Sequence, residues 1–250
     1  MKTHFQKLFY IVLFFFKSPK GLYFWGCFFL ASSKVLQTIA FFLPIKVLIM
    51  LGSEKMPKYL SPFSEYMNYN DVLVFLIAIV PVVYVMHLAF GIFFRLLIDK
   101  DVARFTQKEY HVDGYGNANL GKLKRLHNHT SKAFSDIIVF LLTSVILLLI
   151  NPILTLAIWV VTLLNLSLFV KKAFYVHDDT RITILKLHKR QFVEYIASSN
   201  YLIVFALLVV QMYLVSGEIY GAILALLLSR QLFQAVQRFS IENIYFSKLI

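Results

Sequence analysis

The sequence is poor in charged residues, and acidic residues are the scarcest of them. Charged residues make up 15% of the 250 positions, against roughly a quarter in an ordinary globular chain, while hydrophobic residues make up 59%. A soluble core of this chain length cannot bury that much apolar surface. The composition therefore excludes an ordinary soluble domain and predicts an integral membrane protein.

Cysteine is almost absent, since Cys27 is the single one. This excludes an intrachain disulfide framework and a metal site built from cysteines alone. The seven histidines lack the H-E-x-x-H spacing of a zinc site, and no nucleophile stands beside a general base. We therefore expect no metal site, no cofactor in this chain and no enzymatic activity.

Acidic residues number 13 against 25 lysines and arginines, which gives a net charge of +12. Such a balance can indicate nucleic-acid binding, but basic cytoplasmic loops of a membrane protein explain it better, and we expect no nucleic-acid partner. Eight of the basic residues lie in 95–132 and six in 171–190. Because basic loops gather on the cytoplasmic side, both chain termini are expected there too.

Long apolar runs define the membrane spans, and some of them carry no charge at all. The run Ile137–Val170 has 34 residues, too long for one helix across a hydrocarbon layer of about 30 Å, and Asn151-Pro152 near its middle is a turn signal. With this run divided in two, the chain is expected to be an all-α integral membrane protein. Its six predicted transmembrane helices lie at about 22–50, 72–94, 133–150, 152–170, 195–216 and 219–239.

Two further features complete the expected architecture. Residues 1–20 are predicted to form an N-terminal interfacial elbow, with a helix over 4–16 and a turn at Pro19, ahead of a transmembrane domain at 21–250. The connections 95–135 and 171–194 mix charges with apolar residues at helical spacing. They predict two cytoplasmic helical hairpins that continue the spans.

Taken together, the chain resembles the membrane domain of ABC exporters of the type I fold. The residues that carry the resemblance are Pro44 late in the first span, the stretches Gly121–Leu126 and Ser135–Ile137, and Ser216–Ala225 followed by Leu228–Leu232. The stretches Ser216–Ala225 and Leu228–Leu232 are similar to the turn between spans five and six in exporters of type I secretion systems and of bacteriocins.

The resemblance implies a subunit of the bacterial inner membrane that forms a translocation pathway. It also implies a homodimer, or a pair with a related membrane subunit, within the lipid bilayer. Exporters of this kind usually carry a fused ATPase domain. None is recognisable in these 250 residues, so we expect a separately encoded ABC ATPase subunit with ATP and Mg²⁺ bound there.

Two groups of residues are candidates for function. Polar residues within the spans could line a translocation cavity, although Lys34 could instead reach the interface, and the others could form ion pairs or hydrogen bonds within the bundle. These are Lys34, Gln37, Gln211, Arg230 and Gln234. Residues at the hairpin tips could contact the ATPase, namely Asp113, Tyr115, Asn117, Asp178, Asp179 and Arg181.

Two alternatives remain open. The second hairpin is shorter than in such exporters, which favours a non-transporting membrane scaffold or accessory subunit with the same fold. A membrane-embedded enzyme would need acids or histidines within the spans, where only His87 lies.

The stretch Gly116–Lys122 matches part of a phosphate-binding loop, but Leu123 replaces the hydroxyl that would hold Mg²⁺, so we expect a turn.

Overall fold

The computed structural model describes residues 2–16, 21–53, 68–107, 120–174, 187–214 and 219–249. These residues form seven α-helices and one π-helical segment, and no strand occurs among them. The elements are α1 (Lys2–Phe16), α2 (Leu22–Ser53), α3 (Tyr69–Gln107), α4 (Leu120–Ile150), α5 (Pro152–Phe169), η3 (Val170–Phe174), α6 (Lys189–Leu214) and α7 (Ile219–Leu249).

Five of these helical stretches are long and apolar enough to cross a membrane: Leu22–Gly52, Tyr69–Arg104, Gly121–Ile150, Pro152–Phe174 and Lys189–Leu214. Large apolar side chains on them face outward, such as Leu149 at 82% exposure and Ile153 at 70%. The chain is thus an all-α, multi-pass membrane protein, as predicted. The sixth predicted span falls within α7, which is not among the five, so six crossings stay a prediction.

The predicted break at Asn151-Pro152 is confirmed. Helix α4 ends at Ile150, and Asn151 caps the first turn of α5 because its side-chain oxygen accepts a hydrogen bond from the backbone N–H of Leu154 at 3.1 Å. Pro152 occupies the first position of α5, where a missing N–H costs nothing. The long apolar run therefore folds as two antiparallel helices.

The spans also continue as helices beyond their apolar parts, as predicted. Helix α3 runs on to Gln107, and α4 begins at Leu120, ahead of the span predicted from 133. Helix α6 begins at Lys189, ahead of the span predicted from 195. Helix α7 also reaches Leu249, ten residues beyond the predicted end of its span at Phe239, an extension that was not predicted. The tips of both connections lie outside the described residues.

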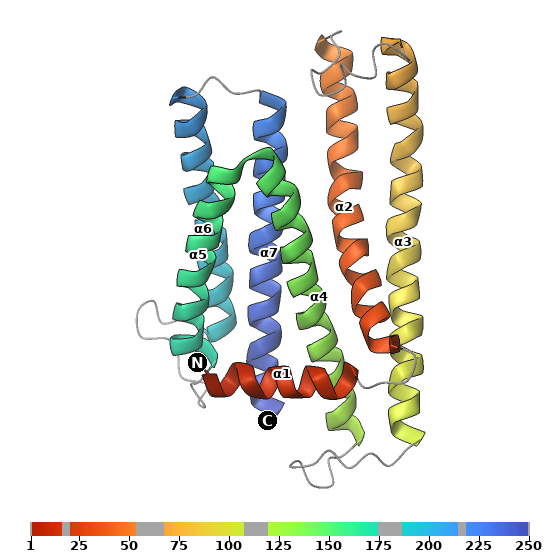
Figure 1. The fold of residues 1–250 in the computed structure, drawn as a ribbon, viewed down its shortest axis with the longest axis vertical. Coiled ribbons are helices and arrows are strands. Elements are labelled where there is room, and N and C mark those ends of the chain that lie inside the picture. Colours follow the sequence, from red (N-terminus) through yellow and green to blue (C-terminus); the bar gives the residue numbers. More distant parts are fainter. Residues whose placement is uncertain are drawn as a thin grey trace.

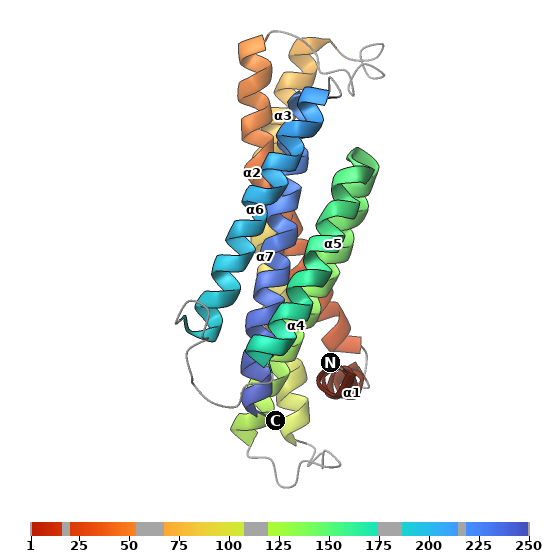
Figure 2. The same cartoon turned by 90° about the vertical axis from the view of Figure 1, so that its left-hand side faces the viewer.

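The long helices run side by side, and α1 lies across one end of them (Figure 1). Both chain termini lie at that same end of the molecule, the end at which α3 finishes and α4 begins (Figures 1 and 2). Gly21, with a φ of +62°, occupies the left-handed region where α2 begins. The predicted helix over 4–16 is present as Lys2–Phe16, while its place at a membrane interface stays a prediction.

The long helices pack as two groups, one made of α4, α5, α6 and α7 and the other of α2 and α3. The largest apolar cluster lies among α4, α5, α6 and α7, with Leu147, Ile158, Val204 and Leu232 at its centre. Helix α2 packs mainly on α3 along its length, and a cluster of Val47, Met50, Val72 and Leu76 closes the end of this pair that lies far from α1 (Figure 1).

At the opposite end, α1 is held by apolar contacts. It buries Leu8, Ile11, Val12 and Phe15 against α2, α4 and α7. The end that carries both termini is therefore the one where α1, α2, α4 and α7 all meet.

Candidate functional site

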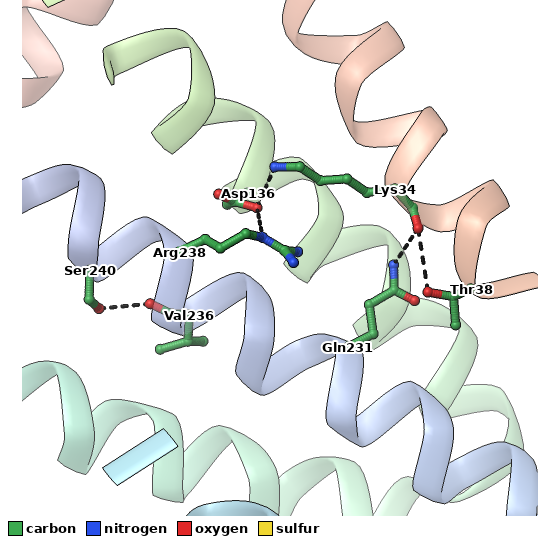
Figure 3. A network of polar contacts seen from close by, with 7 residues as sticks. All are labelled: Lys34, Thr38, Asp136, Gln231, Val236, Arg238 and Ser240. Atoms are coloured by element: carbon green, nitrogen blue, oxygen red, sulfur yellow. Dashed lines mark hydrogen bonds and ion pairs between the residues drawn. The ribbon is translucent and has the colours of Figure 1, made fainter. Parts of the chain in front are cut away.

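One buried carboxylate joins three helices where α2, α4 and α7 meet. Asp136 of α4 is 1% exposed, and its Oδ1 accepts hydrogen bonds from two cations. Lys34 Nζ of α2 donates at 2.7 Å, and Arg238 Nε of α7 donates at 2.9 Å (Figure 3). We call Lys34, Asp136 and Arg238 the charged triad.

The backbone next to the triad is fixed by further polar contacts. The carbonyl oxygen of Lys34 accepts from Gln231 Nε2 at 3.3 Å and from Thr38 Oγ1 at 3.4 Å (Figure 3). Gln231 belongs to α7 and is buried, so this hydrogen bond ties α7 to α2 beside the ion pairs. The triad is thus held by the packing of three helices.

The triad carries two positive charges and one negative charge. A buried carboxylate is costly to desolvate unless it is paired, and here both partners are charged and within hydrogen-bond distance. The side chains of Lys34 and Arg238 are 19% and 38% exposed, whereas that of Asp136 is 1% exposed. The positive charges of the triad are therefore its more exposed part. The triad therefore carries a net charge of +1, and its two cations are partly exposed.

A second buried polar pair lies near α1. His127 Nε2 of α4 and Asp101 Oδ2 of α3 are 2.9 Å apart, and both side chains are almost fully buried. The rings of Phe15 and Tyr23 stand edge-on to the imidazole, with centroid distances of 4.7 and 5.2 Å. This cluster links α1, α2, α3 and α4 at one point.

Helix α4 makes a third polar link, to the last turns of α7. His129 Nδ1 lies 2.6 Å from Glu242 Oε2, and the ring of Tyr245 stacks on the imidazole at 5.3 Å. Together with Asp136 and His127, this makes α4 the element from which polar contacts reach α2, α3 and α7. A displacement of α4 would therefore act on three other helices.

The structure divides the five predicted cavity residues among different places. Lys34 lies in the triad, whereas Gln211 exchanges two hydrogen bonds with Asn151, at 2.8 and 3.2 Å. Asn151 is fifteen residues beyond Asp136 in the sequence, about 22 Å along a helix. Gln211 is therefore hydrogen-bonded to a neighbouring helix within the bundle, which was the alternative to a place in the wall of a translocation cavity.

The other three cavity candidates make no hydrogen bond or ion pair to any described residue. Arg230 and Gln37 are exposed, and Gln234 is half-buried. The six predicted ATPase-contacting residues, Asp113, Tyr115, Asn117, Asp178, Asp179 and Arg181, lie outside the described residues. Their role stays a prediction.

Two members of the triad, Asp136 and Arg238, and the pair of Asp101 with His127 were not predicted from the sequence. A signal for Asp136 was present, because it is the last charge before the run Ile137–Val170. A carboxylate in that position needs a buried cation, and Lys34 is the cation placed deepest in the first predicted span. Arg238 on α7 had no such signal, because its distance to Asp136 is known only once α2, α4 and α7 have been placed relative to one another.

His87, the one histidine within a predicted span, is engaged in helix packing. Its Nδ1 lies 2.8 Å from the carbonyl oxygen of Ser33 and 3.0 Å from the Ser33 hydroxyl. Within the described ranges, no group of three or more histidine, cysteine, aspartate or glutamate side chains could hold a metal ion.

No protein-family model, curated protein or solved structure matches this chain.

Proposed function

We propose that this chain is the transmembrane subunit of an ABC-type exporter, in which it forms the translocation pathway and is driven by a separately encoded ATPase. The observation that carries the proposal is the pair of helical extensions formed by α3 and α4. Residues 95–107 and 120–132 prolong two apolar helices by about 20 Å each, at the end where both termini lie (Figure 1). A simple membrane anchor has no need of them.

The polar links on α4 support this function. A push on the end of α4 would reach α3 through Asp101 and His127, and α2 and α7 through the triad. Packed helices move as stiff bodies, so a force from an ATPase could tilt several spans at once. In this proposal the protein works as a homodimer or with a related membrane subunit, and its termini face the cytoplasm of a bacterial cell.

The test is whether a stand-alone ABC ATPase purifies with this chain and hydrolyses ATP only in its presence. Tyr115→Ala should lower that association or the coupled transport far more than Asp179→Ala, because buried aromatic side chains tend to dominate interface energies. Equal and negligible effects of the two substitutions, with transport intact, would exclude force transmission through these hairpins.

The second candidate is a membrane scaffold or accessory subunit, and one observation favours it. Helix α5 ends at Phe169 and its π-helical extension at Phe174, while α6 has only six residues, 189–194, before its predicted span. The described part of the second connection thus projects much less than α3 and α4. An ATPase that binds the chain without any stimulation of hydrolysis would favour the scaffold.

A further inference from the structure

An apolar cavity of about 960 Å³ lies between α1, α4, α5 and α7. Its walls include Phe9 and Leu13 of α1, Phe140 of α4, Leu166 of α5 and Phe239 of α7. Phe9 and Leu13 are exposed, so the cavity opens to the outside of the protein beside α1. In a membrane the surrounding medium is hydrocarbon, and an apolar cavity binds apolar matter rather than water. The main body of a ligand for this cavity is therefore apolar.

Two polar side chains in the wall have hydrogen-bonding capacity that is not used. Thr162 of α5 is 5% exposed, and its hydroxyl has no hydrogen-bond partner among the described residues. Asp136 of α4 accepts both of its hydrogen bonds at Oδ1. Its Oδ2 points away from Lys34 and Arg238 (Figure 3) and accepts none from the described part of the chain. Because buried polar groups are normally paired and hydrocarbon offers no partner, these atoms indicate where a polar group of a ligand would bind.

The two polar groups lie at similar levels along the bundle. Helices α4 and α5 are antiparallel, and a hydrogen bond of 3.2 Å from Trp159 Nε1 to Ser144 Oγ sets their register. In this register Thr162 is about level with Phe140, which is four residues, or about 6 Å, from Asp136 along α4. One small polar head group can therefore reach both side chains.

The charges near the cavity favour a head group that is neutral and donates a hydrogen bond. Asp136 is the one charged side chain among the described residues that line the cavity. An ionised carboxylate only accepts hydrogen bonds, so a phosphate diester has nothing to donate to it. A cationic head group would be repelled by Lys34 and Arg238, which already engage this carboxylate at 2.7 and 2.9 Å and give the triad its net positive charge. A hydroxyl meets both conditions.

We propose that this cavity is a binding site for a neutral lipid with a free hydroxyl, of the diacylglycerol class. The hydroxyl donates to Oδ2 of Asp136, an ester carbonyl accepts from the hydroxyl of Thr162, and the acyl chains lie along the apolar walls. The site does not depend on transport, so a scaffold would retain it.

The test compares a photoreactive diacylglycerol with its methyl ether, which has the same acyl chains and no hydroxyl to donate. Each is added to the full chain in mild detergent, and crosslinked peptides are identified by mass spectrometry. We expect the diacylglycerol to label the segments around Phe140 and Leu166 about tenfold more than the ether, because the ether leaves a carboxylate oxygen unpaired in an apolar site. Unlabelled diacylglycerol should compete this labelling away, whereas phosphatidylcholine, which has no hydrogen-bond donor, should not.

One variant and a matched control test the polar contact. Thr162→Val keeps the size of the side chain and removes its hydroxyl, so it should lower labelling by the diacylglycerol about fivefold. Thr143→Val is the control, because the buried hydroxyl of Thr143 also lacks a partner among the described residues but does not line the cavity. It should leave the labelling unchanged.

A second variant tests the apolar contact. Leu166→Trp fills the cavity and should lower labelling by both lipids about tenfold. The comparison of Thr162→Val with Thr143→Val does not depend on how well Leu166→Trp folds.

Equal labelling of the unaltered protein by the diacylglycerol and its ether would overturn the proposal, because the cavity would then hold acyl chains without regard to the head group. An equal loss of labelling in Thr162→Val and Thr143→Val would also overturn it. So would labelling that is as strong on the outward face of α3, around Phe75 and Val85, as at the cavity, since that is the pattern of lipid bound all around the protein.

Discussion

At the scale of single residues, Asp136 is the side chain whose charge is least replaceable. It is buried, and two cations from different helices share one of its oxygens. Removing one member of a buried ion pair leaves an uncompensated charge, which costs several kcal/mol. Loss of Asp136 would leave two cations facing each other, whereas loss of either cation would leave one pair intact.

We therefore predict that Asp136→Asn lowers the free energy of unfolding by about 3 kcal/mol, at the lower end of the cost because the side chains of the two cations are partly exposed. Thermal unfolding in detergent measures the change. Glu194→Gln is the control, since its i,i+4 pair with Arg190 is exposed and the expected loss is under about 0.5 kcal/mol. A melting temperature for Asp136→Asn no lower than that of Glu194→Gln would show that the triad does not hold the helices together.

A glycine sets the distance between α2 and α3. A Cβ at Gly26 would lie 3.0 Å from Cδ1 of Ile98 and 3.3 Å from its Cγ1, so the two helices approach closely there. We predict that Gly26→Leu destabilises the protein by about 2 kcal/mol through overpacking, and that Ile98→Ala in the same chain restores most of the loss. Gly52→Leu, in open space on the same helix, should be nearly neutral in the same unfolding assay.

At the scale of elements, the turn between α4 and α5 depends on Asn151. Its side chain caps α5 through Leu154 and exchanges two hydrogen bonds with Gln211 of α6. Asn151→Ala removes all three bonds and should lower the free energy of unfolding by about 2 kcal/mol. Asn151→Asp keeps the cap and loses only the bond donated to Gln211, so it should cost less. The order of the two melting temperatures tests which role dominates, and an Asp variant as unstable as the Ala variant would place the main role in the bond to α6.

The elements were largely predictable because each depends on local sequence. Long apolar runs located five membrane-length helices, and Asn151-Pro152 divided α4 from α5, since a cap and a proline act within one turn. The complete triad was not predictable, because Arg238 had no signal of its own and the members lie 102 residues apart in each pair, Lys34 with Asp136 and Asp136 with Arg238. Contacts of that range follow from helix packing, which periodicity does not encode.

At the scale of the whole molecule, the chain has two distinct ends. One end holds α1, both termini and the extensions of α3 and α4, and the other holds the turn at Asn151 and the end of α2 (Figure 1). Basic residues gather near the first end, for Lys122, Lys124 and Arg125 all lie in the first turns of α4. Since Lys and Arg collect on the cytoplasmic side, the first end should face the cytoplasm.

This orientation predicts how single cysteines react in intact cells, in a background where Cys27 is replaced by serine. Cysteines at Gly52 and Asn151 should react with a membrane-impermeant thiol reagent, because both positions lie at the end that faces outward in this orientation. Those at Lys122 and Lys189 should react only after the membrane is opened, because they begin α4 and α6 at the opposite end. Gly52 and Lys122 are the sharpest pair, as both are exposed. Labelling of Lys122→Cys from outside, with Gly52→Cys protected, would mean that the protein has the opposite orientation in the membrane. The α3–α4 extensions would then lie outside the cell, where a cytoplasmic ATPase could not contact them.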